Sequence, residues 1–298
     1  MISRIRLGVG CALAAAGIYG LVPNFVRGAF ENGIPPVEAT FFRTSVIAVA
    51  FALIAVMQRE SFRIPRAARG AFAGQAFATL VISVSYLASV QFIPIGLAVI
   101  IFFTFPVLIM LASPLVEGKF PGFLRIVVAI FAFAGLVIAI GPSFSDLDIR
   151  GIGLATLASL AGVVQFFTGR SISRYVKPAV FGSLVHLVIW PATLLIALFV
   201  GEGTLQMLPG GAGTATGFYF LLGVAVVYVA AYMLQMSSLR FAPASTVAPF
   251  YNLEPIVTTL CAGLMFGERL TFNQYAGGGI VLAALVVSSL LGSQETKA

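Results

Sequence analysis

The sequence predicts an all-α integral membrane protein with ten transmembrane helices, arranged as two inverted five-helix repeats. Apolar residues make up 60% of its 298 residues and charged residues only 9%, which is far from the composition of a soluble domain. Ten apolar stretches are long enough to cross a bilayer, because about 20 apolar residues suffice. In addition, one spacing of aromatic residues and prolines occurs in both halves of the chain.

In chain order, the predicted spans are approximately 7–26, 36–57, 70–90, 94–115, 123–141, 151–169, 178–200, 216–236, 243–265 and 273–291. Lys and Arg are enriched in cytoplasmic segments. With both ends inside, the inner segments hold thirteen of the 17 Lys and Arg residues, and the outer segments hold only Arg27, Arg150 and Arg269. We therefore predict a multi-pass protein of the plasma (inner) membrane with both termini cytoplasmic.

The repeated spacing divides the chain. Phe92-Ile93-Pro94 precedes Pro106, and Phe241-Ala242-Pro243 precedes Pro255, with twelve residues from proline to proline in each case. These positions predict two repeats, over 1–145 and 146–298. Because each repeat has five spans, the second enters the membrane in the opposite orientation. Inverted repeats commonly place a substrate site near the midplane, at interrupted helices.

The motif that ends the second repeat resembles an EamA-type repeat of the drug/metabolite transporter superfamily. It consists of the proline-bearing span followed by GERLTFNQYAGGGIVLAAL. The first half matches more loosely, through Phe92, Pro94, Pro106, Glu117 and Gly135. The resemblance implies a ten-helix exporter or exchanger. It also implies a central cavity walled mainly by spans three, four, eight and nine, helped by spans one and six, with spans five and ten peripheral.

Glu254 is the principal candidate for substrate binding. A carboxylate at the centre of a span costs about 2.5–3.5 kcal/mol on insertion scales and usually has a function. Pro249 and Pro255 flank it and remove backbone donors, so they are predicted to break this helix, as Pro106 breaks span four. Glu254 could contact a substrate amine, carry a coupling proton, or bond to a neighbouring helix. Its counterpart in the first repeat is Phe105, so its role is not shared by both repeats.

Arg43 lies inside span two, where EamA-type repeats commonly carry an arginine. It could recognise a substrate carboxylate, or anchor carbonyl groups of neighbouring helices. His186, the only histidine, lies close to the repeat-equivalent position. It could be a ligand, although lone membrane histidines more often bond between helices.

The other candidates for substrate binding are aromatic or amide side chains. Tyr86 and Tyr232 occupy similar positions in the two repeats and could wall the cavity, or belong to an interfacial aromatic belt. Tyr251 shares a helical face with Glu254. The last three candidates are Phe102, Asn24 and Gln165. Phe102 adjoins the carbonyl group freed by Pro106, whereas the two amides could contact substrate or join helices.

No feature of the sequence indicates catalysis, a metal site or a cofactor. One histidine and two distant cysteines, Cys11 and Cys261, form no nucleophile–base pair and no metal-ligand spacing. The net charge of +7 is scattered between apolar runs, which argues against nucleic-acid binding. The expected partners are a small-molecule substrate and the lipid bilayer, and a homo-oligomer stays open.

These observations favour a secondary transporter that exports small amphipathic metabolites, such as amino acids or related compounds, by alternating access. Purine- or drug-like substrates are the alternative within this class. A non-transporting structural or signalling membrane subunit is the alternative from another class.

Overall fold

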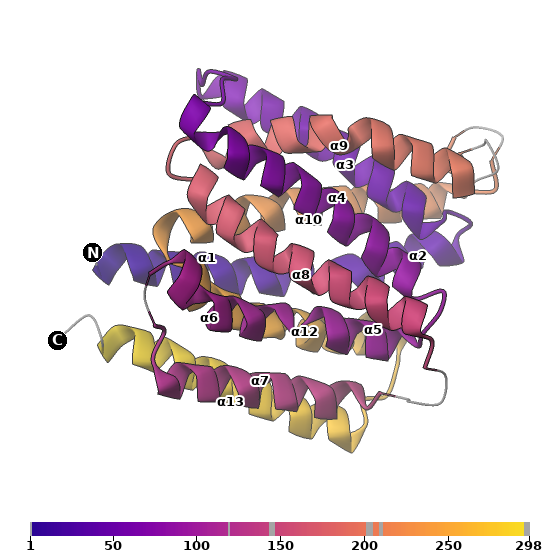
Figure 1. Ribbon diagram of the computed structural model, residues 1–298. Coiled ribbons are helices and arrows are strands. Elements are labelled where there is room, and N and C mark those ends of the chain that lie inside the picture. Colours follow the sequence, from indigo (N-terminus) through magenta and orange to yellow (C-terminus); the bar gives the residue numbers. More distant parts are fainter. Residues whose placement is uncertain (1, 119, 143–146, 201–204, 209–210, 295–298) are drawn as a thin grey trace.

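The computed structural model describes residues 2–118, 120–142, 147–200, 205–208 and 211–294 (Figure 1). Its regular elements are all helical, which confirms the predicted all-α class. The helices are α1 (Ile2–Tyr19), α2 (Val22–Glu31), α3 (Pro36–Met57), η1 (Arg66–Ala68), α4 (Arg69–Ser89), α5 (Ile95–Phe102), α6 (Phe105–Val116), α7 (Phe123–Ile140), α8 (Ile149–Ile172), α9 (Pro178–Val200), α10 (Ala215–Phe241), α11 (Ala244–Val247), η2 (Ala248–Asn252), α12 (Leu253–Phe266) and α13 (Phe272–Gln294).

Nine stretches of the described chain are long and apolar enough to cross a membrane, if α1 with α2 and α5 with α6 each count as one. The predicted span 243–265 is the tenth, and it consists of three short pieces, α11, η2 and α12. None of these pieces reaches the length of a span by itself. Pro249 lies inside η2 and Pro255 is the third residue of α12, where each lacks the amide that would continue a regular α-helix.

The helix contacts stay the same when the two halves of the chain are exchanged. α4 of the first half packs against α8 of the second, and α1 and α2 correspondingly pack against α10. The pairs α3–α9 and α7–α13 each join equivalent spans of the two halves. This pattern is that of a pseudo-twofold relation between two five-span units. The start of α1 and the end of α13 lie on one side of the bundle (Figure 1), here called the terminal face.

The helices α7 and α13 form a pair at the edge of the bundle (Figure 1). Their backbones approach closely because Gly277 lies against α7. A Cβ atom at Gly277 would come within 2.4 Å of the Gly135 carbonyl oxygen and the Ala139 amide nitrogen. Small residues at such crossings allow membrane helices to pack through backbone contacts.

Helix interruptions in spans one, four and nine adjoin one another. α5 ends at Phe102, and α6 begins at Phe105 with Pro106 as its second residue. α1 ends at Tyr19 because Pro23 offers no amide to the Tyr19 carbonyl group. η2 contacts both α1 and α6. The predicted span 7–26 corresponds to α1 and α2, which together form one candidate span, Arg4–Glu31; the break between them was not predicted.

Candidate functional site

Glu254 lies in the first turn of α12, near the middle of the segment 244–266. Its side chain is partly exposed, and its carboxylate forms no hydrogen bond or ion pair with the described residues. Four side chains are close enough to interact with it electrostatically: Tyr19, Arg43, Tyr86 and Tyr251. They come from α1, α3, α4 and η2, so Glu254 faces the interior of the bundle.

Gly20, at the break between α1 and α2, allows the backbone there to pack closely against the backbone of α12 at Glu254. A Cβ atom at Gly20 would lie 2.8 Å from the Glu254 carbonyl oxygen and 2.6 Å from the Val257 Cβ. Asn24 adds a second link, because its Nδ2 donates to the Thr258 carbonyl oxygen at 3.0 Å. The break between α1 and α2 therefore packs directly on the turn of α12 that carries the carboxylate.

Arg43 is the cation that faces Glu254 from α3. Its guanidinium carbon lies 4.3 Å from the centroid of the Tyr228 ring, a cation–π geometry. Its Nη2 donates a long hydrogen bond of 3.3 Å to Ser83 Oγ. Within the described residues it forms no ion pair with a carboxylate. Ionisable groups inside a protein are normally paired. Since neither Arg43 nor Glu254 has an ion-pair partner among the described residues, both retain bonding capacity.

A continuous series of ring contacts runs from Tyr86 to Tyr251. Tyr86 contacts Phe102 at a centroid distance of 5.1 Å, and Phe102 contacts Phe105 at 5.3 Å. Phe105 contacts Phe166 at 5.2 Å, which contacts Tyr251 at 5.0 Å. These residues belong to spans three, four, six and nine. They form an apolar wall in which Phe105, Phe166 and Tyr251 are buried. The two end tyrosines lie within electrostatic range of Glu254.

A second aromatic group supports Arg43. Tyr228 stacks on Tyr232 at 6.3 Å and meets Tyr19 edge-on at 5.3 Å. The Tyr19 hydroxyl donates to Gln235 Oε1 at 2.8 Å. Tyr19, Tyr228 and Gln235 are not among the site residues predicted from the sequence. Tyr228 precedes Tyr232 by four residues and so shares its helical face, which is the signal that could have identified it.

The remaining predicted residues lie behind this site. Tyr232 is fully buried, with the His186 ring 4.9 Å away and the Phe51 ring 5.8 Å away. His186 Nδ1 lies 2.8 Å from the carbonyl oxygen of Gly182 in its own helix. Gln165 Nε2 donates to Thr79 Oγ1 at 3.1 Å and joins α8 to α4. The structure thus places Arg43, Tyr86 and Tyr251 near Glu254, and Phe102 against Tyr86. Tyr232, His186 and Gln165 belong to the surrounding packing.

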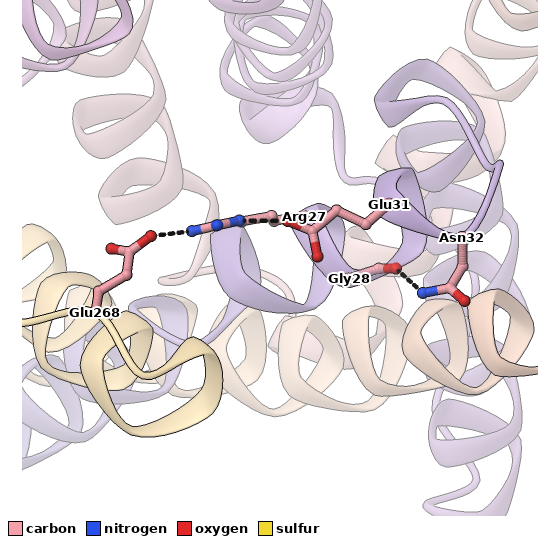
Figure 2. A network of polar contacts seen from close by, with 5 residues as sticks. All are labelled: Arg27, Gly28, Glu31, Asn32 and Glu268. Atoms are coloured by element: carbon pink, nitrogen blue, oxygen red, sulfur yellow. Dashed lines mark hydrogen bonds and ion pairs between the residues drawn. The ribbon is translucent and has the colours of Figure 1, made fainter.

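Glu117 and Glu268, at equivalent ends of spans four and nine, make different contacts. At the terminal face, Glu117 Oε1 accepts a hydrogen bond of 2.7 Å from the Ala244 amide, and Oε2 accepts one from Ser245 Oγ. These bonds tie α6 to the start of α11. At the opposite face, Figure 2 shows Arg27 between Glu31 and Glu268, with nitrogen–oxygen distances of 2.8 and 2.5 Å. Glu268 therefore ties α12 to α2, not to α5.

Comparison with known proteins gives the family. The model of the EamA-like transporter family matches residues 6–141 and again 149–290. The chain belongs to the EamA-like transporter family. The double match also confirms the predicted two repeats, so ten spans in two inverted units describe this EamA-like protein. Its family is one of transporters rather than enzymes. In the described part of the chain, no group of three or more His, Cys, Asp or Glu residues could hold a metal ion.

This EamA-like chain is similar to two transporters from other organisms and to one solved structure. It is 29% identical to the threonine/homoserine exporter RhtA of Escherichia coli K12 over 217 residues. This alignment covers 70% of this chain and 67% of RhtA. An uncharacterised transporter of Archaeoglobus fulgidus is 22% identical over 196 residues, covering 66% and 68%. A crystal structure at 14% identity has a TM-score of 0.79 over 97% of this chain and 99% of the other, which shows a shared fold.

Proposed function

We propose that this protein exports small zwitterionic metabolites, with amino acids and related compounds as its substrate class. The observation that carries the proposal is the pair formed by Arg43 and Glu254. Both side chains are partly exposed inside the bundle and lie within electrostatic range of each other, one a guanidinium and the other a carboxyl group, yet they form no ion pair with each other in the described structure.

Each part of a zwitterion has a partner at this site. The planar guanidinium of Arg43 suits a carboxylate, which it can bind through two parallel hydrogen bonds. The Glu254 carboxylate suits an ammonium group. The aromatic wall from Tyr86 to Tyr251 suits the apolar part of the molecule. The RhtA relative is a threonine/homoserine exporter, which supports the same substrate class.

A planar, purine-like substrate is the second candidate, and the same aromatic wall favours it. Offset stacking on Tyr86 and Phe102 would contribute about 0.5–1.5 kcal/mol per ring pair. Such a compound would not need both Arg43 and Glu254, so the two candidates differ in their dependence on charge.

Competition between substrate analogues in proteoliposomes tests the proposal. We expect unlabelled zwitterionic amino acids to inhibit flux of a radiolabelled amino acid. Their N-acetyl derivatives, which lack the ammonium group, and their amides, which lack the carboxylate, should inhibit at least about tenfold less, because each loses a charge-assisted bond. Equal inhibition by all three forms would contradict zwitterion recognition, and inhibition by purines alone would favour the second candidate.

Transport would proceed by rocking of the two repeats, 1–145 and 146–298, around this site. We place both termini in the cytoplasm and the protein in the plasma membrane, as the distribution of Lys and Arg favours.

A reporter fusion tests the orientation. Fused after Gly141, at the end of α7, alkaline phosphatase should be active and a fluorescent protein that folds only in the cytoplasm should be dark, because five spans precede the fusion. The same pair fused after Gln58, beyond α3, should give the opposite result. A cytoplasmic signal after Gly141 would refute the proposed orientation.

A further inference from the structure

A polar pocket of about 340 Å³ lies on the terminal face, away from the site around Glu254. Three connections meet there: the segment after α3, the turn between α8 and α9, and the end of α10. The residues that matter for its chemistry are Ser61, Arg63, Arg174, Tyr175, Lys177 and Arg240. A neighbouring pocket of about 260 Å³ shares Lys177 and Arg240 with it.

The pocket gathers positive charge that the protein does not neutralise. Lys177 Nζ pairs with Glu60 Oε1 at 2.5 Å, and both residues line the pocket. The guanidinium groups of Arg63, Arg174 and Arg240 form no hydrogen bond or ion pair with any described residue. Three unpaired cations around one pocket repel each other, and a bound anion would relieve that repulsion.

Other groups around the pocket also favour an anion. Lys177 and Val180 line it, and Pro178 and Ala179 line its neighbour, so the amino end of the 23-residue helix α9 lies between the two. The dipole of such a helix places positive potential at this end. Ser61 and Tyr175 add hydroxyl donors at the rim. The enrichment of Lys and Arg in cytoplasmic segments explains why each of these connections carries basic residues. It does not explain why basic residues from three separate connections line the same pocket.

We propose that this pocket binds a phosphate-bearing anion, either the headgroup of an anionic membrane lipid or a soluble phosphate compound. Ser61 and Arg63 belong to the first repeat, whereas Arg174, Lys177 and Arg240 belong to the second. An anion held by both would link the two repeats at the terminal face, and its occupancy would bias their relative movement. The proposal does not depend on which substrate the protein exports.

The test compares two triple variants of the full chain. Arg63→Gln/Arg174→Gln/Arg240→Gln removes the three unpaired guanidinium groups from the pocket. Arg6→Gln/Arg66→Gln/Arg69→Gln removes the same charge from exposed positions outside the pocket, near the start of α1 and of α4. One arm titrates inorganic phosphate against the detergent-purified protein and follows its melting temperature. The other titrates phosphatidylglycerol, with phosphatidylcholine as the control lipid, into the protein in detergent micelles, and measures the lipid retained after purification.

We expect the pocket variant to bind its anion at least about tenfold more weakly than wild type, because it loses several charge-assisted bonds. The control variant should stay within about twofold of wild type, because its three side chains do not line the pocket and are exposed to screening by salt. Retained phosphatidylglycerol that disappears in the pocket variant would identify a lipid headgroup. Stabilisation by inorganic phosphate that disappears in the same variant would identify a soluble phosphate compound.

The proposal fails if the pocket variant binds like wild type, if both variants lose binding equally, or if wild type binds neither probe. Should the triple pocket variant not fold, the single change Arg174→Gln replaces it, because that side chain is exposed and unpaired. It should still weaken anion binding several-fold while the melting temperature without anion stays unchanged. An unchanged affinity in Arg174→Gln would overturn the proposal as well.

Discussion

Replacement of Glu254 by glutamine is expected to weaken the binding of zwitterionic substrates about 10- to 100-fold. A hydrogen bond to a charged group contributes about 1.5–3 kcal/mol, and about 1.4 kcal/mol corresponds to a factor of ten in affinity. Glutamine keeps the shape of the side chain but not its charge, so substrates without an ammonium group should be little affected. Binding and flux in proteoliposomes, measured for both kinds of substrate, check the prediction.

The same variant separates the possible roles of this carboxylate. If Glu254 carries a coupling proton, Glu254→Gln should retain binding and exchange but lose its response to a pH gradient. If the carboxylate is only structural, the variant should transport normally across a pH series, and the substrate site would have to be sought around Arg43 and Tyr86. Asp148→Asn is the matched control, because Asp148 caps α8 outside the spans and its removal should leave transport unchanged.

Gly277→Ala is expected to destabilise the protein without any contact to the candidate site. The added Cβ would lie 2.4 Å from backbone atoms of α7, so α13 must move away from α7. Insertion of a methyl group into a tightly packed contact typically costs about 1–3 kcal/mol. We expect a lower melting temperature and a lower yield of monodisperse protein in detergent.

Gly279→Ala provides the control for this change. It lies two residues further along α13, and a Cβ atom there meets nothing within 4 Å. Both variants gain the same helix propensity, roughly 1 kcal/mol in favour of alanine, so their difference reports the contact with α7. Equal melting temperatures would show that α13 adapts freely and would contradict the role assigned to Gly277.

Much of the fold could be predicted from the sequence because the bilayer imposes simple requirements. Long apolar stretches predicted the spans, and the chemistry of proline indicated where backbone bonds would be missing. The break between α1 and α2 escaped prediction for a physical reason. Pro23 lies close to the predicted end of span 7–26, where a proline needs no explanation, whereas the helical segment continues to Glu31.

The candidate site was only partly accessible to sequence reasoning. Glu254 and Arg43 were selected because isolated charges in apolar segments are costly. Tyr19 and Tyr228 differ from the other aromatic residues only through their neighbours across the bundle. Such contacts join spans one, two and eight, and neither composition nor local spacing reveals them. For the same reason, the sequence did not show that Tyr232 is fully enclosed.

The different partners of Glu117 and Glu268 have a consequence for the rate of the transport cycle. Glu117 bonds to the Ala244 amide and the Ser245 hydroxyl, and charge-assisted bonds of this kind are about twice as strong as neutral ones. The pair Arg27–Glu268 has side chains that are 43% and 49% exposed, and such pairs contribute about 0–1 kcal/mol and weaken with salt. The contact at the face opposite the termini is therefore the weaker of the two, and we expect that face to open more readily. If the termini are cytoplasmic and the substrate is exported, we expect the return of the empty carrier to be the slow step. Exchange of an internal for an external substrate molecule avoids that step, because the carrier then returns loaded.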